Sequence, residues 1–364
     1  MFYELLGTMS PVYKSLIESL IVAVLVFILT FVAGKIIIPV LRAKKLNQPI
    51  NSYVAEHANK AGTPTMGGIC FIIASLIVLL VWTVLEVTGC IFKGEKPIAL
   101  LPFALTVCLG VGNAMIGFID DYKKLVKKDN EGLSEIQKLL LQIIVAAAYL
   151  LMMGITDNLP TEIRIPFTSF APDIGFFAYP LYLLVIVGFV NSTNITDGLD
   201  GLASSIGISS ALGVMAMSAF AMMGVANAAD VLGERYVFIV SASLLGALFG
   251  FLLFNHYPAK VFMGDTGSLY IGGIIMGCAI ASGEFFSVVL ISFVFVLEML
   301  SSLIQRVYFK LTHGKRLFKK APVHHHFQMM KWSEVKIVTV FFGVSVIFAI
   351  IGVFGTLVPD FFLK

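Results

Sequence analysis

The chain has 364 residues, of which 58% are hydrophobic and only 13% are charged, whereas soluble domains carry about 25% charged residues. This composition excludes an ordinary soluble protein and indicates an integral membrane protein whose length is counted in bilayer spans. The net charge is only +3, so the chain lacks the uniform basic surface that binds nucleic acid. We expect residues 1–364 to form a single polytopic membrane domain.

Windows of about 20 apolar residues predict an all-α fold with about ten membrane-spanning helices. The windows are residues 17–41, 68–88, 98–119, 136–155, 175–193, 199–223, 236–254, 267–282, 285–309 and 335–358. The eighth is short enough to be partly enclosed by its neighbours. The ninth exceeds what the roughly 30 Å hydrocarbon core requires, so it should tilt, bend or protrude.

The distribution of basic residues predicts the sidedness of these spans. Cytoplasmic loops are enriched in Lys and Arg near span ends. Loops that follow odd-numbered spans hold 18 Lys and Arg residues, whereas loops that follow even-numbered spans hold four. We therefore expect both termini on the outer side and five loops in the cytoplasm.

Two adjacent carboxylates, Asp120 and Asp121, end the third span. Neighbouring negative charges repel each other, and a carboxylate costs roughly 2.5–3.5 kcal/mol when it is carried toward the bilayer centre. The pair therefore indicates a compensating cation and a functional site. A solvated helix end neutralised by Lys123 and Lys124 is the alternative.

A second polar run follows the fifth span, where Asn194, Asp197 and Asp200 recur at intervals of three residues. In a helical stretch this spacing places all three side chains on one face, which indicates a binding face. A polar turn that caps the next span is the alternative, but it accounts for only one of the two carboxylates.

The seventh loop contains the run Phe262-Met-Gly-Asp-Thr-Gly-Ser268, directly before the eighth span. Gly264 lets the backbone approach a ligand closely, and the free N–H groups at the start of the following helix suit phosphate. Asp265 offers the hard oxygen ligand that a divalent cation prefers. A generic Asp/Gly turn is the alternative.

The ninth loop carries His324, His325 and His326 after a basic stretch. Magnesium prefers oxygen to imidazole, so these rings favour substrate binding, with zinc as a minor alternative. Glu298 is an isolated acid within the ninth span. For it we expect a hydrogen bond to a neighbouring helix, with a proton-relay role as the alternative.

The first loop adds a Gly/Pro/Thr turn between Lys60 and Gly68. The five motifs thus fall in loops one, three, five, seven and nine, all on the side that the basic residues assign to the cytoplasm. They can form one site that combines aspartates for a divalent cation, lysines for phosphates and apolar helices for a lipid. The chain has no P-loop pattern, so metal and side chains would hold a nucleotide diphosphate.

Taken together, the five motifs resemble those of the polyprenyl-phosphate hexose-1-phosphate transferases, and the resemblance covers nearly the whole chain. The motifs are Thr63-Pro-Thr-Met-Gly-Gly68, Asp120-Asp-Tyr122, Asn194-Ile-Thr-Asp-Gly-Leu-Asp-Gly201, Phe262-Met-Gly-Asp-Thr-Gly-Ser268 and Ala321-Pro-Val-His-His-His326. The three histidines, with the run from Gly314 to Phe318, are similar to the bacterial cell-wall branch of that family.

The resemblance implies a phosphotransferase of the bacterial plasma membrane with its active site facing the cytoplasm. It would transfer phospho-N-acetylmuramoyl-pentapeptide from its UDP carrier to undecaprenyl phosphate. The products would be UMP and lipid I, the first lipid-linked peptidoglycan precursor, and Mg²⁺ would be the cofactor. The long ninth span would leave a groove for the prenyl tail.

The resemblance also implies roles for individual residues. Asp265 would bind the metal, Asp120 would ready the lipid phosphate, and Asp121 would support the metal or a lysine, with a covalent aspartyl-phosphate route left open. The residues expected around the nucleotide are Thr65, Asn194, Asp197, Asp200, Phe262, Gly264 and Ser268, with Phe262 stacked on uracil. Those expected around the phosphates and sugar are Lys60, Lys124, Lys138, Asn255, His324, His325 and His326.

Two rival functions remain at the level of sequence. The nearer is a sister transferase that uses UDP-N-acetylglucosamine or a related sugar. The farther is a secondary transporter, which would need polar groups near the bilayer midplane. The sequence also permits a homodimer, because Gly246-x-x-x-Gly250 and Gly273-x-x-x-Gly277 allow close helix contacts.

Overall fold

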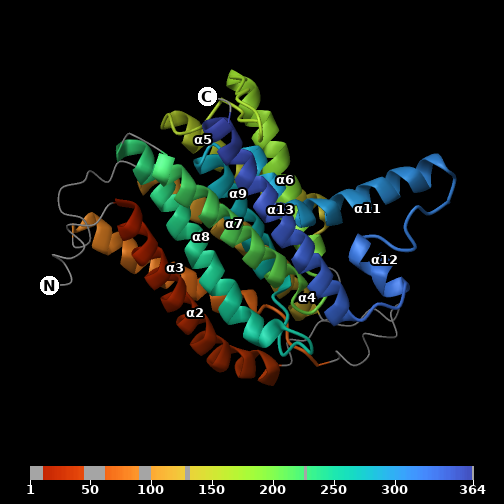
Figure 1. Ribbon diagram of the computed structural model, residues 1–364. Coiled ribbons are helices and arrows are strands. Elements are labelled where there is room, and N and C mark those ends of the chain that lie inside the picture. Colours follow the sequence, from red (N-terminus) through yellow and green to blue (C-terminus); the bar gives the residue numbers. More distant parts are fainter. Residues whose placement is uncertain (1–10, 45–61, 90–99, 128–131, 225–227, 363–364) are drawn as a thin grey trace.

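The computed structural model describes residues 11–44, 62–89, 100–127, 132–224 and 228–362, and in these ranges the predicted all-α fold is confirmed (Figure 1). The α-helices are α2 (Pro11–Ala43), α3 (Gly68–Val87), α4 (Leu100–Lys127), α5 (Glu135–Ile155), α6 (Ala178–Thr196), α7 (Leu202–Gly224), α8 (Ala228–Asn255), α9 (Gly264–Ala281), α10 (Phe285–Ile291), α11 (Phe293–Leu311), α12 (Val323–Met329) and α13 (Glu334–Phe362). The short 3-10 helix η2 (Gly175–Phe177) precedes α6.

The helices follow the predicted apolar windows closely. Within the described ranges, eight helices are long and apolar enough to cross a membrane, and the bent pair of α10 and α11 adds a ninth where the two are counted as one span. The remaining window corresponds to α9, which has 18 residues and carries Asp265 in its first turn. The chain is thus a multi-pass membrane protein, while ten spans and outward-facing termini stay predictions.

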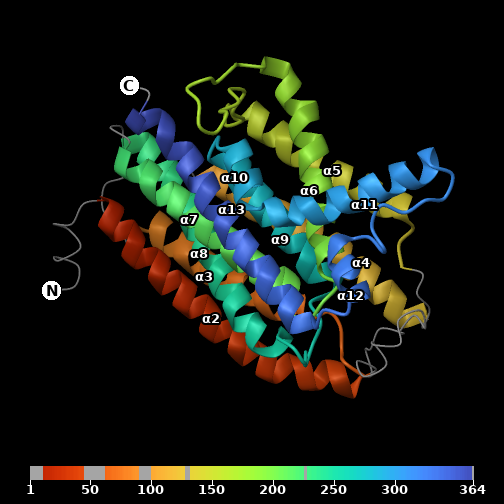
Figure 2. The same ribbon diagram turned by 45° about the vertical axis from the view of Figure 1, so that its right-hand side comes forward.

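The long ninth window bends, as its length predicted. α10 and α11 meet at an angle of 80°, and α11 leaves the helix bundle sideways (Figures 1 and 2). The break lies where α13 passes very close, because a Cβ on Gly352 would lie 2.5 Å from Cγ1 of Ile291 and 2.9 Å from its backbone nitrogen. Close packing of α13 therefore accompanies the bend.

Helix α9 lies at the centre of the bundle and packs mainly against α4 and α6. Nearly all of its residues are buried. Glycines permit this approach, since a Cβ on Gly273 would lie 2.8 Å from Cα of Gly110, and a Cβ on Gly277 would lie 2.6 Å from Cγ2 of Thr106. The enclosure fixes the position of the first turn of α9, where the Asp265 motif begins.

The second pair of spaced glycines joins α8 to α2. A Cβ on Gly246 would collide with the carbonyl oxygen of Ala23, and a Cβ on Gly250 would lie 2.8 Å from that of Phe27. Both glycine pairs are therefore used for contacts within the chain. The homodimer stays a prediction that these glycines no longer support.

A buried ion-pair cluster joins the helix ends opposite the five motifs. Arg235 of α8 donates two hydrogen bonds to Glu18 of α2, at 2.7 and 3.2 Å, and two to Glu86 of α3, at 2.7 and 2.9 Å. Its guanidinium carbon also lies 5.3 Å from the ring centroid of Trp82. The cluster ties three helices together at this end of the bundle.

Candidate active site

The turn before α3 pairs with the loop before α9, which brings the first and fourth motifs together. The backbone N–H of Phe262 donates to the carbonyl of Pro64 at 2.9 Å, and that of Gly67 donates to the carbonyl of Phe262 at 2.8 Å. Gly68 donates to Met263 at 3.0 Å. The side chain of Phe262 between these bonds is half-buried.

Asp121 of α4 caps the start of α9. Its carboxylate accepts from the backbone N–H groups of Asp265 (3.2 Å) and Thr266 (3.0 Å) and from the Thr266 hydroxyl (2.7 Å). The first N–H groups of a helix have no partner within the helix, and a negative charge is favourable there. Asp121 therefore fixes the position of the neighbouring Asp265.

Gly264 leaves no room for a side chain between these groups. Its φ is +72°, and a Cβ would lie 2.5 Å from Oδ2 of Asp121 and 2.9 Å from Oγ1 of Thr65. Only glycine combines this left-handed conformation with such close contacts. Thr65 is buried, and its hydroxyl has no hydrogen-bond partner among the described residues.

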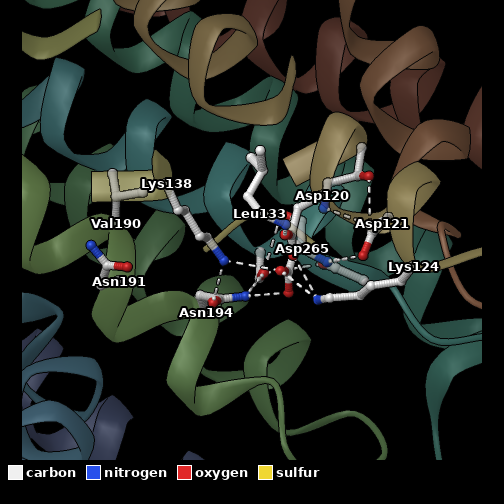
Figure 3. A network of polar contacts seen from close by, with 12 residues as sticks. Asp120, Asp121, Lys124, Leu133, Lys138, Val190, Asn191, Asn194 and Asp265 are labelled. Atoms are coloured by element: carbon white, nitrogen blue, oxygen red, sulfur yellow. Dashed lines mark hydrogen bonds and ion pairs between the residues drawn. The ribbon is translucent and has the colours of Figure 1, made fainter. Parts of the chain in front are cut away.

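Asp265 is the centre of the polar network (Figure 3). Its Oδ2 lies 2.9 Å from Nζ of Lys138 and 3.1 Å from Nζ of Lys124. Its Oδ1 accepts a hydrogen bond of 2.7 Å from Nδ2 of Asn194. Residues of α4, α5, α6 and α9 thus converge on one carboxylate.

Lys138 and Asn194 also hold each other in place. Nζ of Lys138 donates to Oδ1 of Asn194 at 3.0 Å, and Nδ2 of Asn194 donates to the Ser268 hydroxyl at 2.9 Å. Ser134 and Gln137 form a reciprocal capping box at the start of α5. This cap sets where the helix begins and hence where Lys138 enters the site.

Asp120 is buried beside the same network. One carboxylate oxygen lies 2.6 Å from Nζ of Lys124, and the other accepts from the backbone N–H of Leu133 at 2.6 Å. Lys124 therefore bridges Asp120 and Asp265. An ion pair that is removed from water in this way is stronger than an exposed pair.

The residues present fit a divalent cation. Carboxylate oxygens of Asp120, Asp121 and Asp265 lie within 4.8 Å of one another, and such hard oxygen ligands suit Mg²⁺. Asp121 is committed to the helix start, whereas the lysine contacts of Asp120 and Asp265 can be exchanged for a metal ion. Asp265, with Asp120 beside it, is thus the better placed ligand.

Asp200 and Asn255 hold the loop that leads to the Asp265 motif. Oδ2 of Asp200 accepts from the backbone N–H of Ala259 at 2.9 Å. Asn255 is buried, where it accepts from the Ser204 hydroxyl at 2.9 Å and donates to the carbonyl of Val261 at 3.0 Å. In this arrangement both side chains support the loop from within.

Asp197 lies just beyond the end of α6 and takes part in no salt bridge between described residues. Burial, followed by the charges of neighbouring carboxylates of which Asp265 is the strongest, raises the pKa of Asp197 well above its usual range. The ionised side chain is therefore held unfavourably. A hydrogen-bond donor or a cation brought by a ligand would relieve this.

Replacement of Asp197 by Asn should alter stability in a pH-dependent way. Because the folded state raises this pKa, the folded protein binds the proton more tightly than the unfolded chain, and stability falls as pH rises through the raised value. Asn does not ionise, so Asp197→Asn should melt at least about 2 °C above the parent at pH 8 and at nearly the same temperature at pH 4. Thermal unfolding in detergent measures this. Variant and parent melting at the same temperature at pH 8 as well as at pH 4 would contradict the prediction.

The three histidines lie on α12 and each has one held ring nitrogen. Nδ1 of His324 lies 2.9 Å from Oε2 of Glu298, and Nδ1 of His325 lies 2.6 Å from Oε1 of Gln328. Nδ1 of His326 accepts from the backbone N–H of Lys319 at 3.0 Å. His324 is buried, and the other two rings are half-buried.

Four of the motifs thus meet around the start of α9, and the fifth reaches them through His324, whose ring lies next to Gly198 of the third motif. Lys60 lies outside the described residues. The sequence analysis did not single out Thr266, although this residue lies inside the Asp265 motif. It also did not predict that Asp121 caps α9. The hydrogen bond expected of Glu298 is present, and its partner is His324.

Comparison with known proteins agrees with this geometry. The profile described as glycosyl transferase family 4 matches residues 103–283, and signature 1 of phospho-N-acetylmuramoyl-pentapeptide-transferase matches residues 60–72. Fold and site therefore define a membrane-embedded phospho-sugar transferase.

Two relatives from Staphylococcus aureus, both named phospho-N-acetylmuramoyl-pentapeptide-transferase, place the chain further. That of strain bovine RF122 / ET3-1 is 42% identical over 327 residues, and that of strain JH9 is 43% identical over 328 residues. Each match covers 89% of this chain and 94% of the relative. The chain belongs to the phospho-N-acetylmuramoyl-pentapeptide-transferase family, and the resemblance found in its motifs is confirmed.

Proposed function

We propose that the protein transfers phospho-N-acetylmuramoyl-pentapeptide from UDP to undecaprenyl phosphate with Mg²⁺, which yields lipid I and UMP. The observation that supports this most is the meeting of three carboxylates and two lysines at the start of α9. Such a site can bring two phosphate groups together despite their mutual repulsion.

In the proposed reaction a phosphate oxygen of the lipid attacks the sugar-side phosphorus of the pyrophosphate. A new P–O bond forms, the bond to the bridging oxygen breaks, and that oxygen leaves with UMP. Asp120 would accept a proton from the lipid phosphate if one is present, while Lys124 and Lys138 would neutralise charge on the phosphates. Mg²⁺ held by Asp265 would supply Lewis-acid stabilisation of the leaving oxygen. A covalent aspartyl-phosphate route is the alternative chemistry.

We assign the nucleotide to the region between the turn at Thr65 and the segment after α6. The half-buried ring of Phe262 would stack on uracil, and the unpartnered Thr65 hydroxyl would bond to the nucleoside. Asn194 would line this region, and the buried Gly264 and Ser268 would support it from behind, with Asp197 at its edge and with Asp200 and Asn255 acting through the loop they hold. Lys60 and the histidine run would contact the phosphates and the sugar.

We assign the prenyl tail to the face of α11 that points away from the helix bundle. This helix leaves the bundle (Figure 2) and exposes a row of apolar side chains at Leu303, Ile304, Val307 and Leu311. The acceptor would therefore approach from the bilayer of a bacterial plasma membrane, close to the cytoplasmic face.

Turnover in detergent tests the proposal. The protein, Mg²⁺ and undecaprenyl phosphate are supplied with either UDP-N-acetylmuramoyl-pentapeptide or UDP-N-acetylglucosamine, and UMP release is measured. We expect release with the first donor alone. UMP release with UDP-N-acetylglucosamine alone would indicate that the histidines bind another sugar. UMP release with neither donor, in preparations shown to be folded, would overturn the proposal.

The proposed cytoplasmic position of the site has its own test. A cysteine placed by Lys319→Cys, beside the histidines and exposed, should react with a membrane-impermeant thiol reagent only in inverted vesicles. Phe170→Cys, in the exposed segment at the other end of the bundle, is the matched control and should react in intact cells. The reverse pattern would invert the topology.

A further inference from the structure

Glu298 is a fully buried carboxylate in α11. Its Oε2 lies 2.9 Å from Nδ1 of His324, and its Oε1 has no hydrogen-bond partner among the described residues. A carboxylate accepts a hydrogen bond from Nδ1 only when that nitrogen carries the ring proton. The contact therefore fixes how the imidazole ring is turned.

The opposite edge of the ring faces the segment after α6. A Cβ on Gly198 would lie 2.5 Å from Nε2 of His324 and 3.0 Å from its Cε1. Nε2 is itself buried without a hydrogen-bond partner among the described residues. The ring thus fills the space beside Gly198, and it is less accessible to a ligand than the half-buried rings of His325 and His326.

The carboxylate is not the sole attachment of α12 to α11. The Ser301 hydroxyl accepts from the backbone N–H of Val323 at 3.0 Å and donates to the carbonyl of Glu298 at 2.7 Å. The start of α12 is therefore held even without the Glu298 side chain. What that side chain adds is the orientation of one ring.

We propose that Glu298 and His324 are positioning residues: Glu298 holds the imidazole of His324 against Gly198 and so fixes the segment that carries Asp197 and Asp200. Substrate contact within the histidine run then belongs to His325 and His326. This refinement rests on the proposed function, because it takes the segment after α6 to be part of the nucleotide site. It separates His324 from the two residues that follow it in sequence.

A size exchange between positions 198 and 324 tests the contact. Gly198→Ala should press the new methyl group into the ring and lower UMP affinity about tenfold. His324→Asn keeps a donor in the place of Nδ1 for Glu298 but removes the Nε2 edge, and it should lower UMP affinity by a similar factor. The double variant should recover to within about threefold of the parent, since the methyl group fills the space that the ring left.

The role of Glu298 is tested by a second cycle. Glu298→Gln keeps the volume but weakens the charge-assisted hydrogen bond, and it should lower UMP affinity about tenfold, the lower end of the effect seen for residues that orient a metal-bound histidine. Gly198→Ala should cost less in the Glu298→Gln background than in the parent, because a ring that is no longer held can move aside. Gly188→Ala is the control, since a Cβ there meets only Cε of Met299 at 3.9 Å.

UMP affinity is measured by calorimetry, and the melting temperature of each variant is measured in parallel. If the double variant Gly198→Ala with His324→Asn binds no better than His324→Asn alone, the ring edge does more than fill space and the proposal is overturned. If Gly198→Ala costs the same with and without Glu298→Gln, Glu298 does not hold the ring. Failure of the parent to bind UMP would count against the proposed function, and the same cycles read in melting temperature would still decide the contact.

Discussion

Replacement of Asp265 by Asn is expected to lower the rate of UMP release at least about 1,000-fold, the upper end of the effect of losing a single stabilising hydrogen-bond donor. This carboxylate accepts hydrogen bonds from Lys124, Lys138 and Asn194 at the same time. Asn keeps the volume and one acceptor oxygen but removes the charge that would bind a metal ion and that holds both lysines. UMP release is measured with Mg²⁺ at saturating concentrations of both substrates.

Two measurements separate this effect from misfolding. Binding of Mg²⁺, followed by calorimetry, should weaken in Asp265→Asn, while the protein should still insert and melt cooperatively. Asp157→Asn is the matched control, because Asp157 is exposed in the segment between α5 and η2 and its left-handed backbone conformation suits Asn. Turnover of Asp265→Asn within tenfold of the parent would remove the metal assignment.

Replacement of Arg235 by Met is expected to give the largest loss of stability, about 3–5 kcal/mol, since two buried carboxylates then lose their shared partner. The side chain of Arg235 is only 3% exposed, and those of Glu18 and Glu86 are 10% and 6% exposed. The cluster lies at the end of the bundle opposite the site. Thermal unfolding should therefore shift while UMP affinity at low temperature stays unchanged.

An ion pair with one exposed partner provides the comparison for Arg235. Arg164 bonds to Glu284 at 3.0 Å with 61% of its side chain exposed, so Arg164→Met should cost no more than about 1 kcal/mol. Combining Glu18→Gln and Glu86→Gln with Arg235→Met should restore part of the lost stability, because no buried charge then remains. Equal melting of Arg235→Met and the parent would show that the cluster contributes nothing.

The fold was largely predictable because apolar windows report directly on membrane spans. The bend between α10 and α11 was predicted from length alone, but its position was not. That position coincides with the close passage of Gly352 on α13 against Ile291, a contact between residues far apart in sequence. The enclosure of α9 likewise depends on which neighbours surround it.

The composition of the site was predictable to a different degree. The polar motifs and their common side followed from local spacing and from the distribution of lysines. The division of labour within each motif did not, because it depends on partners in other helices. Asp120 and Asp121 are adjacent in sequence, yet Asp120 faces Lys124 whereas Asp121 caps α9. Asn255 looked like a ligand residue and is buried as support for a loop.

The network around Asp265 has a consequence for how the protein exists between catalytic cycles. Three carboxylates face two ammonium groups, a helix start and an amide, so most of the negative charge is already compensated by the chain itself. We therefore expect the chain to fold without a bound ion, in contrast to small domains that unfold when their metal is removed. With Mg²⁺ as the proposed bound ion, the site would be emptied and refilled without loss of structure, and the concentration of free Mg²⁺ would set activity without setting how much folded protein is present.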